Sequence, residues 1–139
     1  MSEPYRLHEL GSLVLLDWTA TPTVVALDAI GVRIDGALAR GQQLALITVI
    51  RDGTVAPDSK VRDHMNQVFK PRLVKFRAHC LVIEGKGLAA DAKRLFTRAA
   101  LSLIGQGAPI FDSLQSALHS PAFAPEAALE GRALALRAG

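Results

Sequence analysis

The chain has 139 residues and a net charge of +3, and 50% of its residues are hydrophobic but only 5% aromatic. This length fits one domain, and the hydrophobic content excludes a disordered chain, so we expect one folded domain with an aliphatic core. The single cysteine, Cys80, excludes an internal disulfide and suits a reducing compartment. The N-terminus lacks the apolar region of a signal peptide, and no apolar run approaches the roughly 18 residues of a transmembrane helix. These features predict a cytoplasmic protein without a transmembrane segment.

The first fifty residues predict a β-hairpin, a helix and a buried strand. Residues 5–10 and 13–18 are strand-like runs joined by a Gly turn, so we expect a hairpin whose first strand lies at a sheet edge. A helix is expected to open at Thr21-Pro22, because Thr caps free N–H groups and Pro suits the first helical position. Residues 43–50 are nearly all apolar, which is typical of a strand buried on both faces of a parallel, helix-covered sheet.

The middle of the chain predicts a basic helix. A loop over residues 51–59 leads into a segment whose apolar side chains recur at helical spacing. Pro71 cannot donate the helical hydrogen bond, so we expect it to kink or split this helix and a short helical piece to follow. Between Lys60 and Arg98, ten Lys or Arg residues stand against three Asp or Glu, a balance of +7. Such a run is either a solvated helix face or a surface for an acidic partner or phosphate-bearing ligand. The few aromatic residues do not interleave with it, which argues against specific nucleic-acid binding.

The last part of the chain predicts two further strand-helix units and a tail. The expected elements are a strand over residues 79–84, a helix over 88–104, a short strand over 108–111 and a short helix after Asp112-Ser113. Residues 1–120 would then form a single α/β domain, a mixed sheet covered by about four helices. Residues 121–139 form an Ala/Leu-rich tail that begins with a Pro-containing hinge over 121–125, and residues 126–138 would form a short amphipathic helix. That tail is either disordered, docked on a partner, or docked on the domain itself.

A glycine-rich turn follows the strand over residues 79–84. Gly85-Lys86-Gly87, with Ala90, matches the G-x-G-x-x-A fingerprint in which a helix N-terminus holds a pyrophosphate. The turn is late in the chain, and too few residues follow it for a second nucleotide-binding half. A Gly turn between strand and helix also explains these glycines without a ligand, so nucleotide binding here stays an alternative.

Two hydroxyl groups lie near the predicted start of the basic helix. Ser59 is a candidate phospho-acceptor, because a helix N-terminus stabilises added negative charge; the other reading is a helix cap beside Asp58. Thr54 is a weaker candidate on the same loop. The four histidines show no close metal-ligand spacing, and neither G-x-S-x-G nor a P-loop is present. We therefore expect no metal, no cofactor, no catalytic residue and no enzymatic activity.

The order of these elements resembles the STAS domain, the fold of anti-sigma-factor antagonists, and especially its small stand-alone SpoIIAA-like branch. The resemblance covers residues 5–119 and is carried by a strand leading to a helix (13–23), a central buried strand (44–50) and a closing strand and short helix (110–118). Antagonists of this type carry a Ser or Thr in an Asp-Ser-Ser-Gly-like turn that a partner kinase phosphorylates. Asp58-Ser59 is the nearest match, although Lys60 and Val61 stand where that turn has its second Ser and its Gly.

The resemblance implies a non-enzymatic regulatory module that binds a protein partner through residues 51–65. The expected partner-binding residues are Asp58, Lys60, Arg62 and His64, toward which the basic helix would steer an acidic surface. One alternative is a carrier of a small apolar or lipid-like ligand in a cavity between sheet and helices. The second alternative is nucleotide binding at Gly85-Lys86-Gly87. A homodimer through an edge strand or residues 126–138 is a further expectation.

Overall fold

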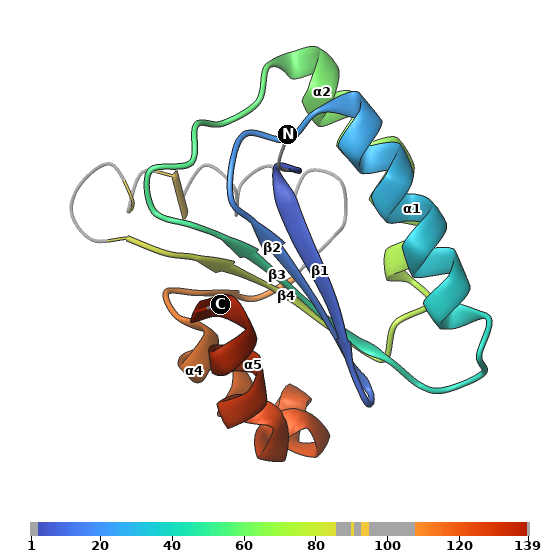
Figure 1. Ribbon diagram of the computed structural model, residues 1–139, viewed down its shortest axis with the longest axis vertical. Helices are drawn as coiled ribbons and strands as arrows, with labels where there is room; N and C mark the ends of the chain where they lie inside the picture. The colour runs from blue at the N-terminus through green and yellow to red at the C-terminus, as the bar shows by residue number, and fades with distance from the viewer. Residues whose placement is uncertain (1–2, 86–89, 91–92, 95–107, 139) are drawn as a thin grey trace.

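The protein is built on a five-stranded mixed sheet with the strand order β1-β2-β3-β4-β5. In this computed structural model, residues 3–85, 90, 93–94 and 108–138 are described. The strands are β1 (Tyr5–Leu10), β2 (Leu13–Trp18), β3 (Ala45–Ile50), β4 (Ala78–Ile83) and β5 (Ile110–Phe111). Strand β1 is antiparallel to β2, and each later strand is parallel to the one before it (Figure 1). The α/β class and the mixed sheet predicted from the sequence are confirmed.

The hairpin between β1 and β2 is also confirmed. Leu10 pairs with Leu13 across a turn of two residues, and Gly11 has a φ of 55°, a conformation that glycine adopts without a steric penalty. Strand β1 has no neighbour on its other side among the described strands, so it forms one edge of the sheet.

Two long helices cover one face of the sheet. Helix α1 (Val24–Leu38) connects β2 to β3, and α2 (Ser59–Leu73) connects β3 to β4. Because consecutive parallel strands are neighbours, right-handed crossovers place both helices on the same side, as Figure 1 shows. Alternate strand residues point into this layer; its core includes Val14, Leu16, Trp18, Leu46, Leu27, Ile30, Ile34 and Val68.

The bounds of these two helices correct the predicted start of the first helix and the predicted break at Pro71 in the second. Helix α1 begins at Val24 with Thr23 as its N-cap, whose hydroxyl accepts from the Ala26 N–H, whereas the Thr21 hydroxyl donates to the Val55 carbonyl. Helix α2 runs through Pro71 to Leu73 without splitting. Since Pro71 lies in the last turn, it removes only one backbone hydrogen bond. That bond lies near the helix end, where the last carbonyl groups have no partner within the helix in any case.

The C-terminal residues cover the opposite face of the sheet. This layer contains α4 (Leu114–Leu118), the 3₁₀ helix η1 (Pro121–Leu129) and α5 (Glu130–Ala138), seen below the strands in Figure 1. Phe123 and Ala133 are fully buried against sheet residues such as Leu15 and Ile47. Of the three alternatives for the C-terminal tail, the structure therefore shows residues 121–138 docked on the chain's own sheet.

The predicted helix over residues 88–104 lies mostly outside the described residues. Ala90, Lys93 and Arg94 are described and helical. Lys86 and Gly87, from the glycine-rich turn, are not among the described residues. No helix in the described part of the chain is long and apolar enough to cross a membrane.

Candidate functional site

Three charged residues lie where neighbouring parallel strands end. Asp17 is the penultimate residue of β2, Arg51 follows β3 and Glu84 follows β4. Asp17 pairs in register with Val49, and Ile50 pairs with Ile83. Because side chains alternate along a strand, all three charged residues face the C-terminal layer. The carboxyl ends of parallel strands are the usual location of sites in α/β proteins.

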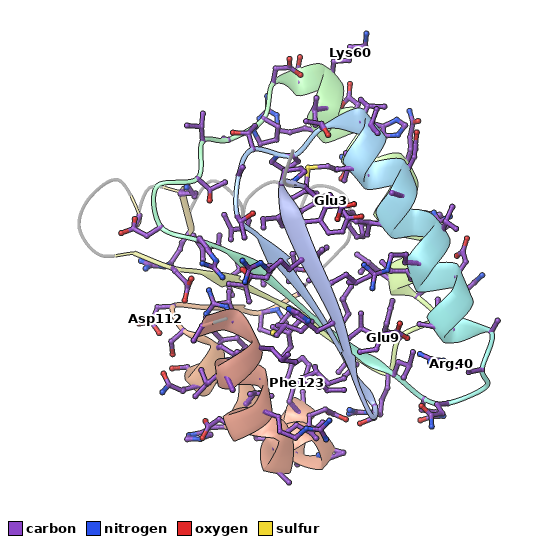
Figure 2. All side chains as sticks on the ribbon, in the orientation of Figure 1. Glu3, Glu9, Arg40, Lys60, Asp112 and Phe123 are labelled. Atoms are coloured by element: carbon purple, nitrogen blue, oxygen red, sulfur yellow. The ribbon has the colours of Figure 1, made fainter. Side chains whose placement is uncertain are left out.

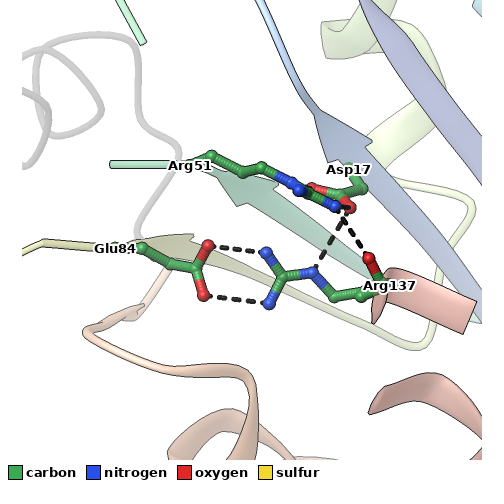
Figure 3. Close-up of polar contacts among 4 residues, drawn as sticks. All are labelled: Asp17, Arg51, Glu84 and Arg137. Carbon is green, nitrogen blue, oxygen red and sulfur yellow. Dashed lines mark hydrogen bonds and ion pairs between the residues drawn. The ribbon is translucent and has the colours of Figure 1, made fainter. Parts of the chain in front are cut away.

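Helix α5 supplies a fourth charge to this group, which we call the carboxyl-edge cluster (Asp17, Arg51, Glu84 and Arg137; Figure 3). Arg51 donates to both oxygens of the Asp17 carboxylate, at 3.1 and 2.7 Å. Arg137 donates through Nη1 and Nη2 to the two oxygens of Glu84, at 2.9 and 2.6 Å, and through Nε to Asp17 at 3.3 Å. Arg51 also donates to the Arg137 carbonyl at 3.1 Å. The cluster thus fastens α5 to the ends of three strands.

The electrostatics of the cluster keep the Asp17 carboxylate charged. Burial alone would raise the pKa of Asp17, but hydrogen bonds and positive charge from Arg51 and Arg137 outweigh burial and hold that pKa below its ordinary value. Hydrogen bonding to Glu84 in turn raises the pKa of Arg137. Every oxygen of the two carboxylates accepts a hydrogen bond from an arginine. The two carboxylates and two guanidinium groups therefore balance in charge and act together as a structural clasp.

A second clasp lies at the opposite end of the strands. Glu126, on η1, is fully buried and accepts from the Arg77 guanidinium and the Ser12 hydroxyl. Arg77 also donates to the Ala122 carbonyl at 2.7 Å. We call Glu126, Arg77 and Ser12 the amino-edge cluster. The two clusters hold the C-terminal layer at both ends of the sheet.

A surface hollow of about 170 Å³ adjoins the carboxyl-edge cluster. Its described lining is Asp52, Gly53, Thr54, Glu84, Ala90 and Lys93. The Lys93 ammonium donates to the Thr54 carbonyl at 2.7 Å. Gly85 has a φ of 122°, and a Cβ there would come within 2.7 Å of an Asp52 oxygen. Because the Asp52 side chain is exposed and can move, it is the positive φ that favours glycine at 85, and this position is explained without a ligand.

The predicted site residues at the start of α2 are brought together on the surface. Asp58 is the N-cap and accepts from the Val61 N–H at 2.9 Å, and Ser59 is the first residue of the helix. Lys60 and Arg62 are exposed in the same turns, and Lys60 projects from the end of α2 in Figure 2. His64 Nε2 lies 2.7 Å from an Asp28 carboxylate oxygen on α1. Thr54 lies apart from this group, in the lining of the hollow.

The remaining candidates for chemistry lie in strand β4, where His79 is partly buried and Cys80 is fully buried. Burial lowers the pKa of His79 to about 4 and raises the pKa of the Cys80 thiol to about 12. Cys80 is thus a free and fully buried thiol. Within the described residues, no three His, Cys, Asp or Glu side chains gather in a group that could hold a metal ion.

The carboxyl-edge cluster is what the sequence reasoning missed. A usable signal was present, since Asp17, Arg51 and Glu84 each interrupt or directly follow an apolar strand. Charges at consecutive strand ends meet at one edge of a parallel sheet. Arg137 carries no such signal, because its contact depends on how the C-terminal segment docks.

The sequence matches no protein-family model and no curated protein. The fold and the site together define an α/β protein with a mixed sheet, two helical layers and a clasp at each end of its strands.

Proposed function

We propose that the protein is a non-enzymatic interaction module of STAS-like type whose partner docks on the start of α2 and the loop before it. The N-terminal hairpin, the consecutive parallel strands and the position of Asp58-Ser59 at the start of the helix after β3 support the STAS-like assignment. We call Val55, Asp58, Ser59, Lys60, Arg62 and His64 the α2-start surface.

The observation that carries the proposal is Val55, which is 70% exposed on a loop held in place by side chains. The Thr21 hydroxyl donates to the Val55 carbonyl at 3.1 Å, and the His64–Asp28 pair ties α2 to α1 close by. An exposed apolar side chain on a fixed backbone can be buried by a partner at little cost in conformational entropy. Burying one valine contributes about 1.5 kcal/mol.

The charge of this surface favours an acidic partner. Lys60 and Arg62 are exposed in the first turns of α2, and the Asp58 carboxylate caps the helix. Exposed cations of this kind act mainly on the association rate and on the choice of partner. Binding should therefore weaken as salt concentration rises.

The described chemistry supports a non-enzymatic role. Both carboxylates of the carboxyl-edge cluster are held by arginines, and the Cys80 thiol is buried. The carrier alternative lacks comparable support. Two hollows of the described surface, of about 280 and 170 Å³, include charged residues such as Glu9, Arg40 and Lys93 in their lining.

The test is site-specific photo-crosslinking in cells of the source organism. A photoreactive amino acid replaces Val55, and the matched control carries it at Val74, which is 76% exposed at the other end of α2. We expect a discrete adduct from position 55 alone, with a partner identified by mass spectrometry. The purified partner should then lose at least about tenfold in affinity for a Lys60→Glu/Arg62→Glu variant. Adducts of equal yield at both positions, or none at position 55, would contradict the proposal.

The same purified partner tests the role of Ser59. Ser59→Asp adds negative charge to the surface and should weaken binding of an acidic partner, whereas Ser59→Ala should leave affinity unchanged. Equal affinities for the two variants would remove Ser59 as a phosphorylation switch while leaving the docking surface intact.

A further inference from the structure

Helix α1 has an apolar face on the side that points away from the sheet. Val25 and Val32 are 81% and 71% exposed, and Ala29 and Gly36 are exposed beside them. We call these four residues the α1 outer face. The opposite side of the helix, with Leu27 and Ile30, is fully buried on the sheet. A helix that packs on one side and faces water on the other normally carries polar residues on its outer side, so this face is unusual.

The spacing of the α1 outer face is that of a coiled-coil seam. Positions 25, 29, 32 and 36 are separated by four, three and four residues, which is the alternation that keeps one stripe facing a partner helix. Valine would occupy both d positions, and alanine and glycine the two a positions. Small residues at alternate layers let two helix backbones approach closely.

Charged residues of opposite sign border the two sides of this face. Asp28 and Asp35 lie on the side of α2, where they pair with His64 and Arg72. Arg33 and Arg40 lie on the side of β1: Arg33 donates to the Leu7 carbonyl at 3.1 Å, and Arg40 pairs with Glu9. Figure 2 shows Glu9 and Arg40 together near the C-terminal end of α1. In coiled-coil terms Asp28 and Asp35 occupy g positions and Arg33 an e position, and Arg40 follows the end of α1 where the next e position would fall.

We propose that two copies of this chain associate through the α1 outer face, with their α1 helices parallel. A two-fold axis along the helices places the acidic border of one copy against the basic border of the other. Asp28 then lies opposite Arg33 of the second copy, and Asp35 opposite Arg40 of the second copy, because g and e′ residues five positions apart meet in parallel pairs. An antiparallel pair would set aspartates against aspartates and arginines against arginines.

The dimer is weak and forms with rising concentration. A single helix pair buries less than the roughly 1,200 Å² of a standard stable interface. The bordering charges are exposed and have partners within their own chain, so they select the parallel orientation more than they add affinity. The α1 outer face contains none of the α2-start surface, so this inference does not depend on the proposed function.

The first test is the mass of the protein in solution across a concentration series, by sedimentation equilibrium. The wild type should pass from the mass of one chain toward that of two. Val32→Lys places a charge in the seam and should weaken association at least about tenfold. The matched control, Val74→Lys, changes an equally exposed valine outside the face and should dimerise like the wild type. A wild type that stays at the mass of one chain, or a dimer that Val32→Lys leaves unchanged, would overturn the proposal.

The second test determines the orientation. Gly36→Cys introduces a thiol at a position where an added Cβ meets no atom within 4 Å, and the native Cys80 is buried. In a parallel pair the two introduced thiols face each other, within the roughly 7 Å between Cα atoms that a disulfide spans. In an antiparallel pair they would lie roughly 16 Å apart along the axis. Mild oxidation with glutathione disulfide should therefore yield a covalent dimer, and a Lys60→Cys control should not. A dimer sensitive to Val32→Lys that fails to cross-link at position 36 would overturn the parallel arrangement.

Discussion

The carboxylate of Asp17 is fully buried and charged at the same time. Removing a carboxylate from water costs several kcal/mol unless other groups replace the lost hydration. Two arginines do so here, one from the loop after β3 and one from the last helix. Since each residue comes from a different part of the chain, the charge on Asp17 depends on the whole fold being in place.

Asp17→Asn should lower the free energy of unfolding by about 3 kcal/mol, because it leaves Arg51 and Arg137 at a buried edge without a shared carboxylate. The measurement is urea denaturation at pH 7. Asp28→Asn is the matched control: its partner His64 lies in an exposed pair, so the change should cost less than about 1 kcal/mol. Equal costs for the two variants would show that the cluster contributes no more than a surface pair.

His79 should make the protein less stable as pH falls. Burial lowers the pKa of His79 from 6.5 to about 4, so the unfolded chain takes up a proton at a higher pH than the folded one. The stabilisation is complete above pH 6.5 and is lost progressively as pH falls toward 4, by up to about 3 kcal/mol.

The check on His79 is the free energy of unfolding of the wild type and of His79→Gln between pH 4 and 8. Their difference should change with pH only below about 6.5, because above it His79 is neutral in both states. Some pH dependence should persist in the variant, because burial also lowers the pKa of His8. Parallel curves across the whole range would contradict this assignment.

Two glycines of α1 differ in what surrounds them. A Cβ on Gly31 would lie 3.2 Å from the Arg72 guanidinium carbon and 3.3 Å from a Val68 methyl, whereas one on Gly36 would meet nothing within 4 Å. Arg72 cannot retreat freely, because it donates to the Gly31 carbonyl and to the carboxylate of Asp35. The first glycine is therefore required by the contact between α1 and α2.

Gly36→Ala should raise the free energy of unfolding by about 0.5–1 kcal/mol through higher helix propensity. Gly31→Ala should lower it by about 1 kcal/mol, since the cost of overpacking exceeds the same gain in propensity. Thermal and urea unfolding at low protein concentration measure both variants. A stabilising Gly31→Ala would show that α2 moves away from α1 without penalty.

The elements that the sequence predicted well are those whose signals are local. The apolar runs of β2 and β3 and the glycine turn at Gly11 depend on neighbouring residues alone. The start of α1 was misplaced because Thr21 and Thr23 are both acceptable caps, and Thr21 is used in a contact with the distant Val55. The predicted break at Pro71 is wrong because proline disrupts a helix most in its interior. Pro71 lies in the last turn of α2, where one missing hydrogen bond costs little.

In the candidate site, too, local contacts could be predicted from the sequence and long-range contacts could not. Asp58 and Ser59 could be placed at a helix start from the sequence, because capping is a short-range pattern. The buried Glu126 could not be anticipated, since its partner Arg77 is 49 residues away along the chain. In the sequence, the proline- and alanine-rich surroundings of Glu126 indicated a hinge.

The sheet separates two hydrophobic cores that share the same strands. Residues of even number in β2, such as Trp18, face α1 and α2, while Leu15 and Leu13 face the C-terminal layer. Phe123 anchors that second layer, and Figure 2 places it beneath the sheet. A layer that forms half the core cannot detach without exposing fully buried leucines to water.

Phe123→Ala should therefore lower the free energy of unfolding by about 3–5 kcal/mol, the usual cost of removing a large buried aromatic side chain. Leu136→Ala, in the same layer but 37% exposed, should cost less than about 1 kcal/mol and serves as the control.

Two optical signals can show whether the two cores of Phe123→Ala unfold together. Trp18 is the only tryptophan and lies in the opposite core, so its fluorescence reports on the α1–α2 layer. Far-ultraviolet circular dichroism reports on all helices. Because the carboxyl-edge and amino-edge clusters tie the C-terminal layer to both ends of the strands, the two signals should shift together in Phe123→Ala. An early loss of helical signal with an unchanged Trp18 transition would mean that residues 121–138 detach independently, and that the two cores are separate cooperative units.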